Sequence, residues 1–178
     1  MGFGKAFGFS LLAYIGLNFL FLIIALTISG DLNLLFQDIS SQPLILFVLF
    51  LGPIYFFPGL NISGIYLSIS LGAPAEILIL AIGSVVSPFV ASIIAGKMGE
   101  NKAGSFGGWF LTGILCSIIL GIFAFIEPLA LTYYGSIYMY GIPVIDPTST
   151  FIISILSGAV SGVFYGAFAL LFTKTEYY

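Results

Sequence analysis

Side chains that commonly carry out chemistry in proteins are scarce in this sequence. It has no histidine, a single cysteine (Cys116), and four lysines with no arginine against seven acidic residues. Without histidine no Ser-His or Cys-His pair can form, and a zinc, haem or copper site would lack its usual ligands. The absence of arginine removes the bidentate clamp for phosphate and carboxylate groups. We therefore expect no catalytic residue, no metal site and no cofactor, and predict that the protein is not an enzyme.

Three polar side chains are candidates for a role inside or beside a membrane helix. Asn18 lies near the middle of a long apolar segment, where it can hydrogen-bond another helix or line a path for a polar solute; the hydrogen bond is the simpler interpretation. Glu76 and Glu127 lie at the ends of other apolar segments, and the helix dipole favours a carboxylate at the position of Glu76. No long apolar segment carries a charge near its centre, which argues against a proton pump, a voltage sensor or a cation antiporter.

The elements that position these residues are predicted to lie in a membrane. The 178-residue chain is 60% hydrophobic and 6% charged, whereas an ordinary soluble domain is about 25% charged. A soluble protein of this composition has too few polar groups to cover its surface, and a bilayer removes that need. We predict a single all-α integral membrane domain over residues 1–178. The chain has no basic patch, so we expect no nucleic-acid partner.

Four apolar segments are long enough to cross a bilayer, which takes about 20 residues of helix. They are residues 7–29, 75–96, 105–126 and 151–172. The apolar stretch between the first and second is broken by Pro53 and Pro58 into the halves 44–57 and 60–72. Each half is too short to span comfortably, so we predict a short outer hairpin beside four long transmembrane helices. Two short spans, giving six in all, are the alternative.

The distribution of charge predicts the orientation of the chain. Lysine concentrates in short loops on the cytoplasmic side of membranes. An even number of crossings in the proline-broken stretch places all lysines on one side and most acidic residues on the other. The cytoplasmic set is Lys5, Lys97, Lys102 and Lys174, with Glu100 and Glu176, and the outer set is Asp31, Asp38, Glu76, Glu127 and Asp146. We predict a multi-pass protein of the plasma membrane with both termini cytoplasmic.

Small residues recur at every fourth position on three of the predicted spans, which places them on one helix face. Such faces let helices pack closely in a membrane. The stripes are Gly158, Gly162 and Gly166; Ser87, Ala91, Ala95 and Gly99; and Gly104, Gly108, Thr112 and Cys116. The simpler interpretation is packing within the chain's own bundle. The alternative is an interface with a partner subunit or a second copy, for which the last span has the longest glycine ridge.

The predicted outer side of the protein is rich in aromatic residues. Tyr133, Tyr134, Tyr138 and Tyr140 lie in the loop before the last span, where tyrosines form an aromatic belt or a protein-binding surface. A glycosylation sequon begins at Asn61 on the same side, but its apolar surroundings argue against modification. The tyrosine-rich loop and the apolar hairpin together favour a protein partner.

Together these features favour a non-catalytic membrane subunit that assembles with, stabilises or anchors a larger membrane protein complex, and whose interior has almost no polar groups. The alternative is a small-solute transporter or channel component, because interrupted helices at membrane depth often line a binding site. In size and in a six-span layout the chain is similar to the substrate-binding subunits of energy-coupling vitamin transporters. It shares no motif with them, so the similarity assigns no binding residue. A third possibility is a lipid-binding protein. The partners we expect are membrane lipids and other membrane subunits or further copies of the chain.

Overall fold

The computed structural model describes residues 2–126 and 146–173, and every regular element in them is helical. In chain order the elements are α1 (Gly2–Ser29), α2 (Leu32–Ser41), α3 (Ile45–Leu51), η1 (Gly52–Tyr55), α4 (Pro58–Ser70), α5 (Ala75–Met98), α6 (Lys102–Ile126) and α8 (Pro147–Leu171). Four of them, α1, α5, α6 and α8, are long and apolar enough to cross a membrane. The prediction of an all-helical chain with four such helices is confirmed.

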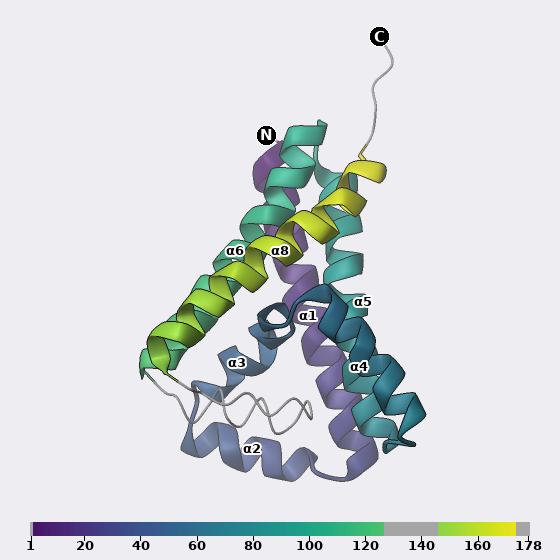
Figure 1. Cartoon of the computed structure of the whole chain (residues 1–178), viewed down its shortest axis with the longest axis vertical. Coiled ribbons are helices and arrows are strands. Elements are labelled where there is room, and N and C mark those ends of the chain that lie inside the picture. The colour runs from purple at the N-terminus through teal and green to yellow at the C-terminus, as the bar shows by residue number, and fades with distance from the viewer. Residues whose placement is uncertain (1, 127–145, 174–178) are drawn as a thin grey trace.

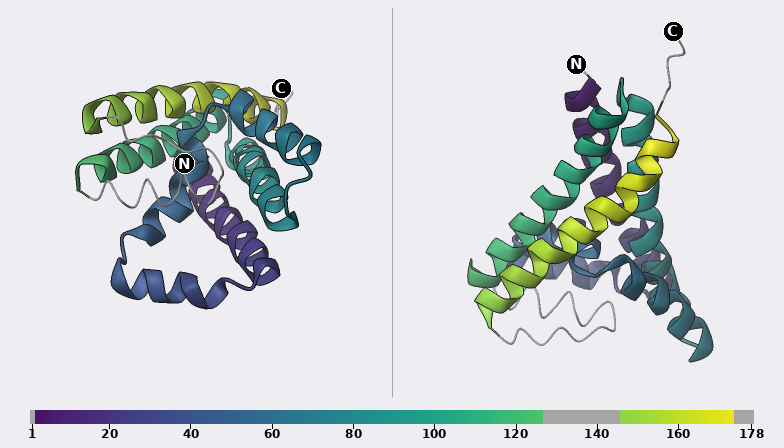
Figure 2. Two further views of the ribbon diagram at one scale, coloured as in Figure 1. Left: turned by 60° about the horizontal axis from the view of Figure 1, so that its bottom comes forward. Right: turned by 45° about the horizontal axis from the view of Figure 1, so that its top comes forward.

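The four long helices form a splayed bundle (Figure 1). They converge where α1 and α6 begin and where α5 and α8 end, and they spread apart toward the opposite end. α6 packs along α8, and α1 packs along α5 and also contacts α6. Figure 2 shows α2 lying across the open end, with α3 rising from it into the space between the two pairs.

The proline-broken stretch forms a bent pair of helices that reaches into the bundle. Its arms, Ile45–Tyr55 and Pro58–Ser70, meet at an angle of 96°. Pro58 explains the turn, because the residue before a proline is forced into an extended conformation and Phe57 has ψ of 143°. α3 climbs from the open end and α4 returns to it beside α5 (Figure 1). The chain therefore enters and leaves this hairpin at the same end of the bundle.

Several helix boundaries differ from the predicted ones. α1, α6 and α8 each begin three to five residues before the apolar run; α8 starts early because the Asp146 carboxylate accepts a hydrogen bond from the Ser149 amide at 2.9 Å. The first hairpin arm, Ile45–Tyr55, is shorter than the predicted half 44–57, whereas the second, Pro58–Ser70, is as long as the predicted half 60–72 and begins two residues earlier. The sequence also contains a helix that we did not predict, α2, because its mixed polar and apolar residues do not form a long apolar run.

Large apolar side chains cover the outside of the bundle, and small or polar ones fill the inside. Leu12 and Leu171, for example, are 69% and 77% exposed. The buried polar residues in the described part of the chain are Ser10, Asn18, Asn61, Ser68, Ser84, Ser87, Ser92, Ser105, Thr112, Ser117, Thr150, Ser154, Ser157, Ser161 and Thr173. The expectation of an interior with almost no polar groups was therefore wrong. It rested on the scarcity of charges, whereas the interior contains neutral hydroxyls and amides, which hydrogen-bond between helices at low cost.

Charge is segregated along the long axis of the bundle. Lys5 lies in the second turn of α1, Lys97 in the last turn of α5, and Lys102 at the start of α6. We call the converging end, which these three residues mark, the lysine end. Asp31 and Glu76 border the opposite ends of α1 and α5. This is the separation that an even number of crossings predicts.

Candidate functional site

The break between the two hairpin arms is held by polar side chains of α1. The Asn18 side chain donates from Nδ2 to the Phe50 carbonyl oxygen at 2.7 Å, and the Tyr14 hydroxyl donates to the Leu51 carbonyl oxygen at 3.0 Å. Both acceptors belong to the last turn of α3, and Pro53 has no N–H with which to extend that helix. Asn18 therefore satisfies the Phe50 carbonyl, whose donor in the following 3-10 helix would have been the missing N–H of Pro53, and Tyr14 adds a bond to the carbonyl of Leu51, the N-cap of η1.

A third side-chain hydrogen bond to the hairpin break comes from the second arm of the hairpin. Asn61 donates from Nδ2 to the Pro53 carbonyl oxygen at 3.2 Å, and its side chain is 2% exposed. The nitrogen that a glycan would modify is thus buried and already hydrogen-bonded within the protein. The sequon at Asn61 is not an accessible glycosylation site in this fold.

Both asparagines leave one buried acceptor without a partner. The Oδ1 atoms of Asn18 and Asn61 make no hydrogen bond, and neither does the Oγ atom of Ser87 or the hydroxyl of Tyr165. An unsatisfied buried polar group costs about 1–3 kcal/mol. A carboxamide oxygen can only accept a hydrogen bond. The hairpin break therefore contains two buried hydrogen-bond acceptors without partners.

A row of aromatic rings connects Tyr14, which hydrogen-bonds the hairpin break, to α6 and α8. Tyr14 packs edge-on against Trp109 of α6 with ring centroids 6.1 Å apart, and Trp109 packs edge-on against Tyr165 of α8 at 6.0 Å. One turn from Tyr14 on α1, the hydroxyls of Ser10 and Thr112 hydrogen-bond at 2.8 Å. One buried face of α1 thus contacts α6 and the hairpin at once.

Sequence reasoning singled out Asn18 but not its two neighbours on the same face. Ser10, Tyr14 and Asn18 are spaced four residues apart, which places them in one row along α1. This spacing of polar residues in an apolar helix was the signal available in the sequence. Asn61 was noticed only as a sequon, and no local pattern indicates that it serves the hairpin break.

The predicted glycine ridge of the last span lies against α6. Atoms of α6 occupy the space where a Cβ would stand at each position, with Ser117 against Gly158, Phe110 against Gly162 and Phe106 against Gly166. The phenylalanine rings and the Ser117 side chain fill the notches that the glycines leave. This face of α8 is therefore covered by the chain itself.

The other two predicted stripes are also buried within the chain. Gly108 faces Ala6 of α1, and Gly104 lies close to Phe3 and to Asn101, whose side chain accepts a hydrogen bond from the Gly104 amide at 2.7 Å. The remaining members with no exposed surface are Ser87, Ala91, Ala95, Thr112 and Cys116. The four predicted outer-face tyrosines, Tyr133, Tyr134, Tyr138 and Tyr140, and the carboxylate of Glu127 lie outside the described residues.

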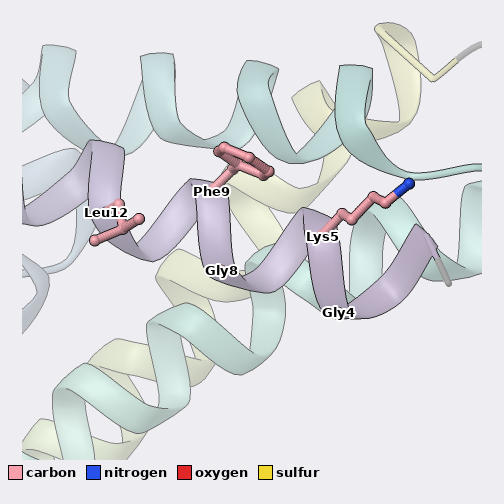
Figure 3. A pocket seen from close by; sticks show the side chains of 5 residues that line it. All are labelled: Gly4, Lys5, Gly8, Phe9 and Leu12. Atoms are coloured by element: carbon pink, nitrogen blue, oxygen red, sulfur yellow. The ribbon is translucent and has the colours of Figure 1, made fainter.

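The outer face of α1 differs from these packed faces. A Cβ added at Gly4, Gly8 or Gly16 would meet no atom within 4 Å. Only 22% of the most apolar stretch of α1 is buried, against 39–50% in the other three long helices. Gly4 and Gly8 lie in a shallow groove of about 310 Å³ that Lys5, Phe9 and Leu12 also line (Figure 3).

The described residues contain no cluster of three or more histidine, cysteine or acidic side chains that could hold a metal ion. Cys116 is buried and unpaired with another cysteine. No protein-family model, curated protein or solved structure matches this chain.

Proposed function

We propose that this protein is a non-catalytic integral membrane subunit that packs against another membrane protein and stabilises a larger complex. The outer face of α1 supports this proposal. Gly16 lies in the middle of α1 between Leu12 and Leu20, which are 69% and 51% exposed. The glycine is therefore a notch between two protruding apolar side chains.

A notch of this kind, with apolar side chains on both sides and far along α1 from its one charged residue, Lys5, allows another helix to approach closely. Lipid tails are as apolar as leucine, so helices in a bilayer associate through close backbone approach at small residues. The chain uses this mode of packing repeatedly, because glycines on α5, α6 and α8 lie against neighbouring helices. Gly16 presents the same surface on the least covered long helix, and a partner helix that crosses there would find the same close approach.

In this proposal the lysine end and both termini are cytoplasmic, because lysine-bearing short loops are retained on that side. The loop between α5 and α6 carries Lys97 and Lys102 at its two borders. The hairpin of α3 and α4 then enters the bilayer from the outer side and returns to it. Its buried backbone is tolerated at that depth because Tyr14, Asn18 and Asn61 satisfy its carbonyls.

Gentle purification tests the assembly proposal. A tagged chain is extracted from its own membrane in mild detergent, and the retained proteins are quantified by mass spectrometry for the wild type and two variants. Gly16→Leu fills the α1 notch, and Gly59→Leu is the matched control on α4, where a Cβ is equally free of contacts. A stoichiometric partner should accompany the wild type and Gly59→Leu and be lost from Gly16→Leu. A wild-type protein that purifies alone contradicts the proposal.

The hairpin break supports a second candidate, a substrate-binding component of a small-solute transporter. Discontinuous helices often form solute sites near the middle of a membrane. Here the unpartnered Oδ1 atoms of Asn18 and Asn61 are the acceptors that a polar solute would use. A solute from a panel of vitamins and small polar compounds should raise the melting temperature of the wild type but not of Asn18→Leu. An equal rise in both proteins argues against binding at the break.

A further inference from the structure

We propose that the groove at the start of α1 binds an anionic phospholipid, with the lipid phosphate at Lys5 and an acyl chain over Gly8. This inference goes beyond the proposed function, because a lipid in this groove requires no partner protein. It rests on the shape of the groove, on the order of polar and apolar residues along it, and on the charge at its end.

The groove is an open hollow formed by one helix. Gly4 and Gly8 lie one turn apart along α1 and add no side chain to the groove, and Phe9 and Leu12 line it toward the middle of the helix (Figure 3). Lys5 lies nearer the end of the helix and extends toward the first turn. From the end of α1 toward its middle, the groove thus presents the Lys5 ammonium group, then the backbone at Gly8, and then the apolar side chains of Phe9 and Leu12. A phospholipid has the matching order of phosphate, glycerol ester and hydrocarbon.

The charge at this end of the molecule favours an anion. Lys5 is exposed, and none of the contacts described for residues 2–126 and 146–173 pairs it with a carboxylate. Glu100, the carboxylate within the described residues at this end, packs against Gly2, which is buried, whereas Lys5 faces outward. Lysines at the cytoplasmic surface attract the anionic lipids of that leaflet.

The same lysine argues against a second copy of the chain as the occupant. A parallel, symmetric pairing through Gly4 and Gly8 would bring two Lys5 side chains to the same interface, where like charges repel. A phosphate supplies the opposite charge. The hollow on α8 lined by Ala159, Val160, Val163 and Phe164 is larger, about 450 Å³, but has no charged residue. It offers no group that would select a headgroup.

Native mass spectrometry of delipidated protein tests the proposal. The protein is titrated with phosphatidylglycerol and with phosphatidylcholine that carry identical acyl chains. We expect the first anionic lipid to bind about fivefold more tightly, which corresponds to ~1 kcal/mol for one lysine near an anionic group. Lys5→Gln should abolish this preference, and Gly8→Leu should weaken binding of both lipids at this site. Gly8→Leu should fold normally, since its added side chain meets no atom within 4 Å at Cβ.

Two matched controls separate a defined site from general attraction. Lys102→Gln removes one charge from the same end and should keep the preference, and Gly16→Leu fills an open glycine outside the groove and should bind lipid like the wild type. Equal effects of Lys5→Gln and Lys102→Gln would overturn the site in favour of diffuse attraction to the lysine end. Unchanged lipid binding in a folded Gly8→Leu protein would place the lipid elsewhere. Gly8-dependent dimers without added lipid would make a second copy the occupant.

These outcomes are independent of the assembly proposal. Loss of a protein partner in Gly16→Leu with intact lipid preference would support both proposals. Retention of the partner in Gly16→Leu, with lipid binding abolished by Gly8→Leu, would contradict the partner interface and leave the lipid site intact.

Discussion

Replacing Gly158 by alanine should push α8 away from α6 and destabilise the protein. A Cβ at Gly158 meets the Ser117 side chain and lies 3.0 Å from the Gly113 carbonyl oxygen of the facing helix. The Ser117 hydroxyl donates to the Ile114 carbonyl at 2.9 Å, and the Ser117 carbonyl accepts from the Ser154 hydroxyl at 2.6 Å. Moving Ser117 aside would disturb these bonds. The new methyl group must therefore separate two backbones that are now in close contact.

The size of the effect follows from two opposing contributions. An extra methyl group in a tightly packed interior costs about 1–3 kcal/mol, and the higher helix propensity of alanine offsets up to ~1 kcal/mol of that. Because the new Cβ meets both a side chain and a backbone carbonyl, the cost lies in the upper part of that range, about 2–3 kcal/mol, and we expect Gly158→Ala to lower the free energy of unfolding by about 1–2 kcal/mol. Gly16→Ala is the matched control, because its Cβ meets no atom within 4 Å. Only the propensity difference applies there, so its stability should rise by up to ~1 kcal/mol.

Unfolding by sodium dodecyl sulfate in mixed micelles measures both variants through tryptophan fluorescence. Trp109 is the single tryptophan of the chain. It is fully buried, and its Nε1 atom donates to the Ser161 carbonyl across the same helix interface at 3.4 Å. The two alanine variants should shift the unfolding midpoint in opposite directions. A Gly158→Ala protein as stable as the wild type, or two shifts of the same sign, would refute the close packing of α6 and α8 as a source of stability.

Three further predictions concern the hairpin, the interior and the topology. Asn18→Leu leaves the Phe50 carbonyl unpaired and should lower the free energy of unfolding by about 1 kcal/mol. Backbone amides at the hairpin break should then exchange hydrogen faster, and exchange at the wild-type rate would contradict a stabilising role of the Asn18 hydrogen bond. Cys116 is buried, so a maleimide should label it only after unfolding, and rapid labelling of native protein would contradict the packing of α6. Two single-cysteine variants in a Cys116→Ala background, Ala103→Cys and Asn33→Cys, test the topology at exposed positions. The cysteine at position 103 should react with an impermeant maleimide added to the cytoplasmic side, and the cysteine at position 33 with one added to the outer side. Labelling of both from one side would contradict the orientation.

The sequence predicted the long helices well because the signal for each is local. An uninterrupted apolar run of about 20 residues can satisfy its backbone in a bilayer only as a helix. Pro53 and Pro58 likewise marked the hairpin break. α2 was missed because its apolar residues form no long uninterrupted run; Leu32, Leu35, Phe36 and Ile39 recur instead with the spacing of an amphipathic helix. The buried polar interior was missed because serine, threonine and asparagine are neutral, so the scarcity of charged residues gave no indication of them.

The candidate site was only partly visible in the sequence. Asn18 stood out as an amide within an apolar helix. Its partner is a backbone carbonyl 32 residues away, and that carbonyl needs a donor only because the hairpin breaks beside it. Asn61 donates to the same break from the other arm. No local pattern connects the two asparagines, since their common function depends on the position of the hairpin tip between α1 and α4.

The sequence by itself determined the all-helical class of this protein, the number of long apolar helices, the place of the hairpin break and the separation of lysines from most acidic residues. Each of these follows from composition or from spacing along one segment. The tertiary structure alone decided which glycine faces are filled and that the outer face of α1, with Gly4, Gly8 and Gly16, stays open. The reason is geometric: a four-residue repeat assigns residues to one face of a helix, but the neighbour that covers this face comes from a distant part of the chain.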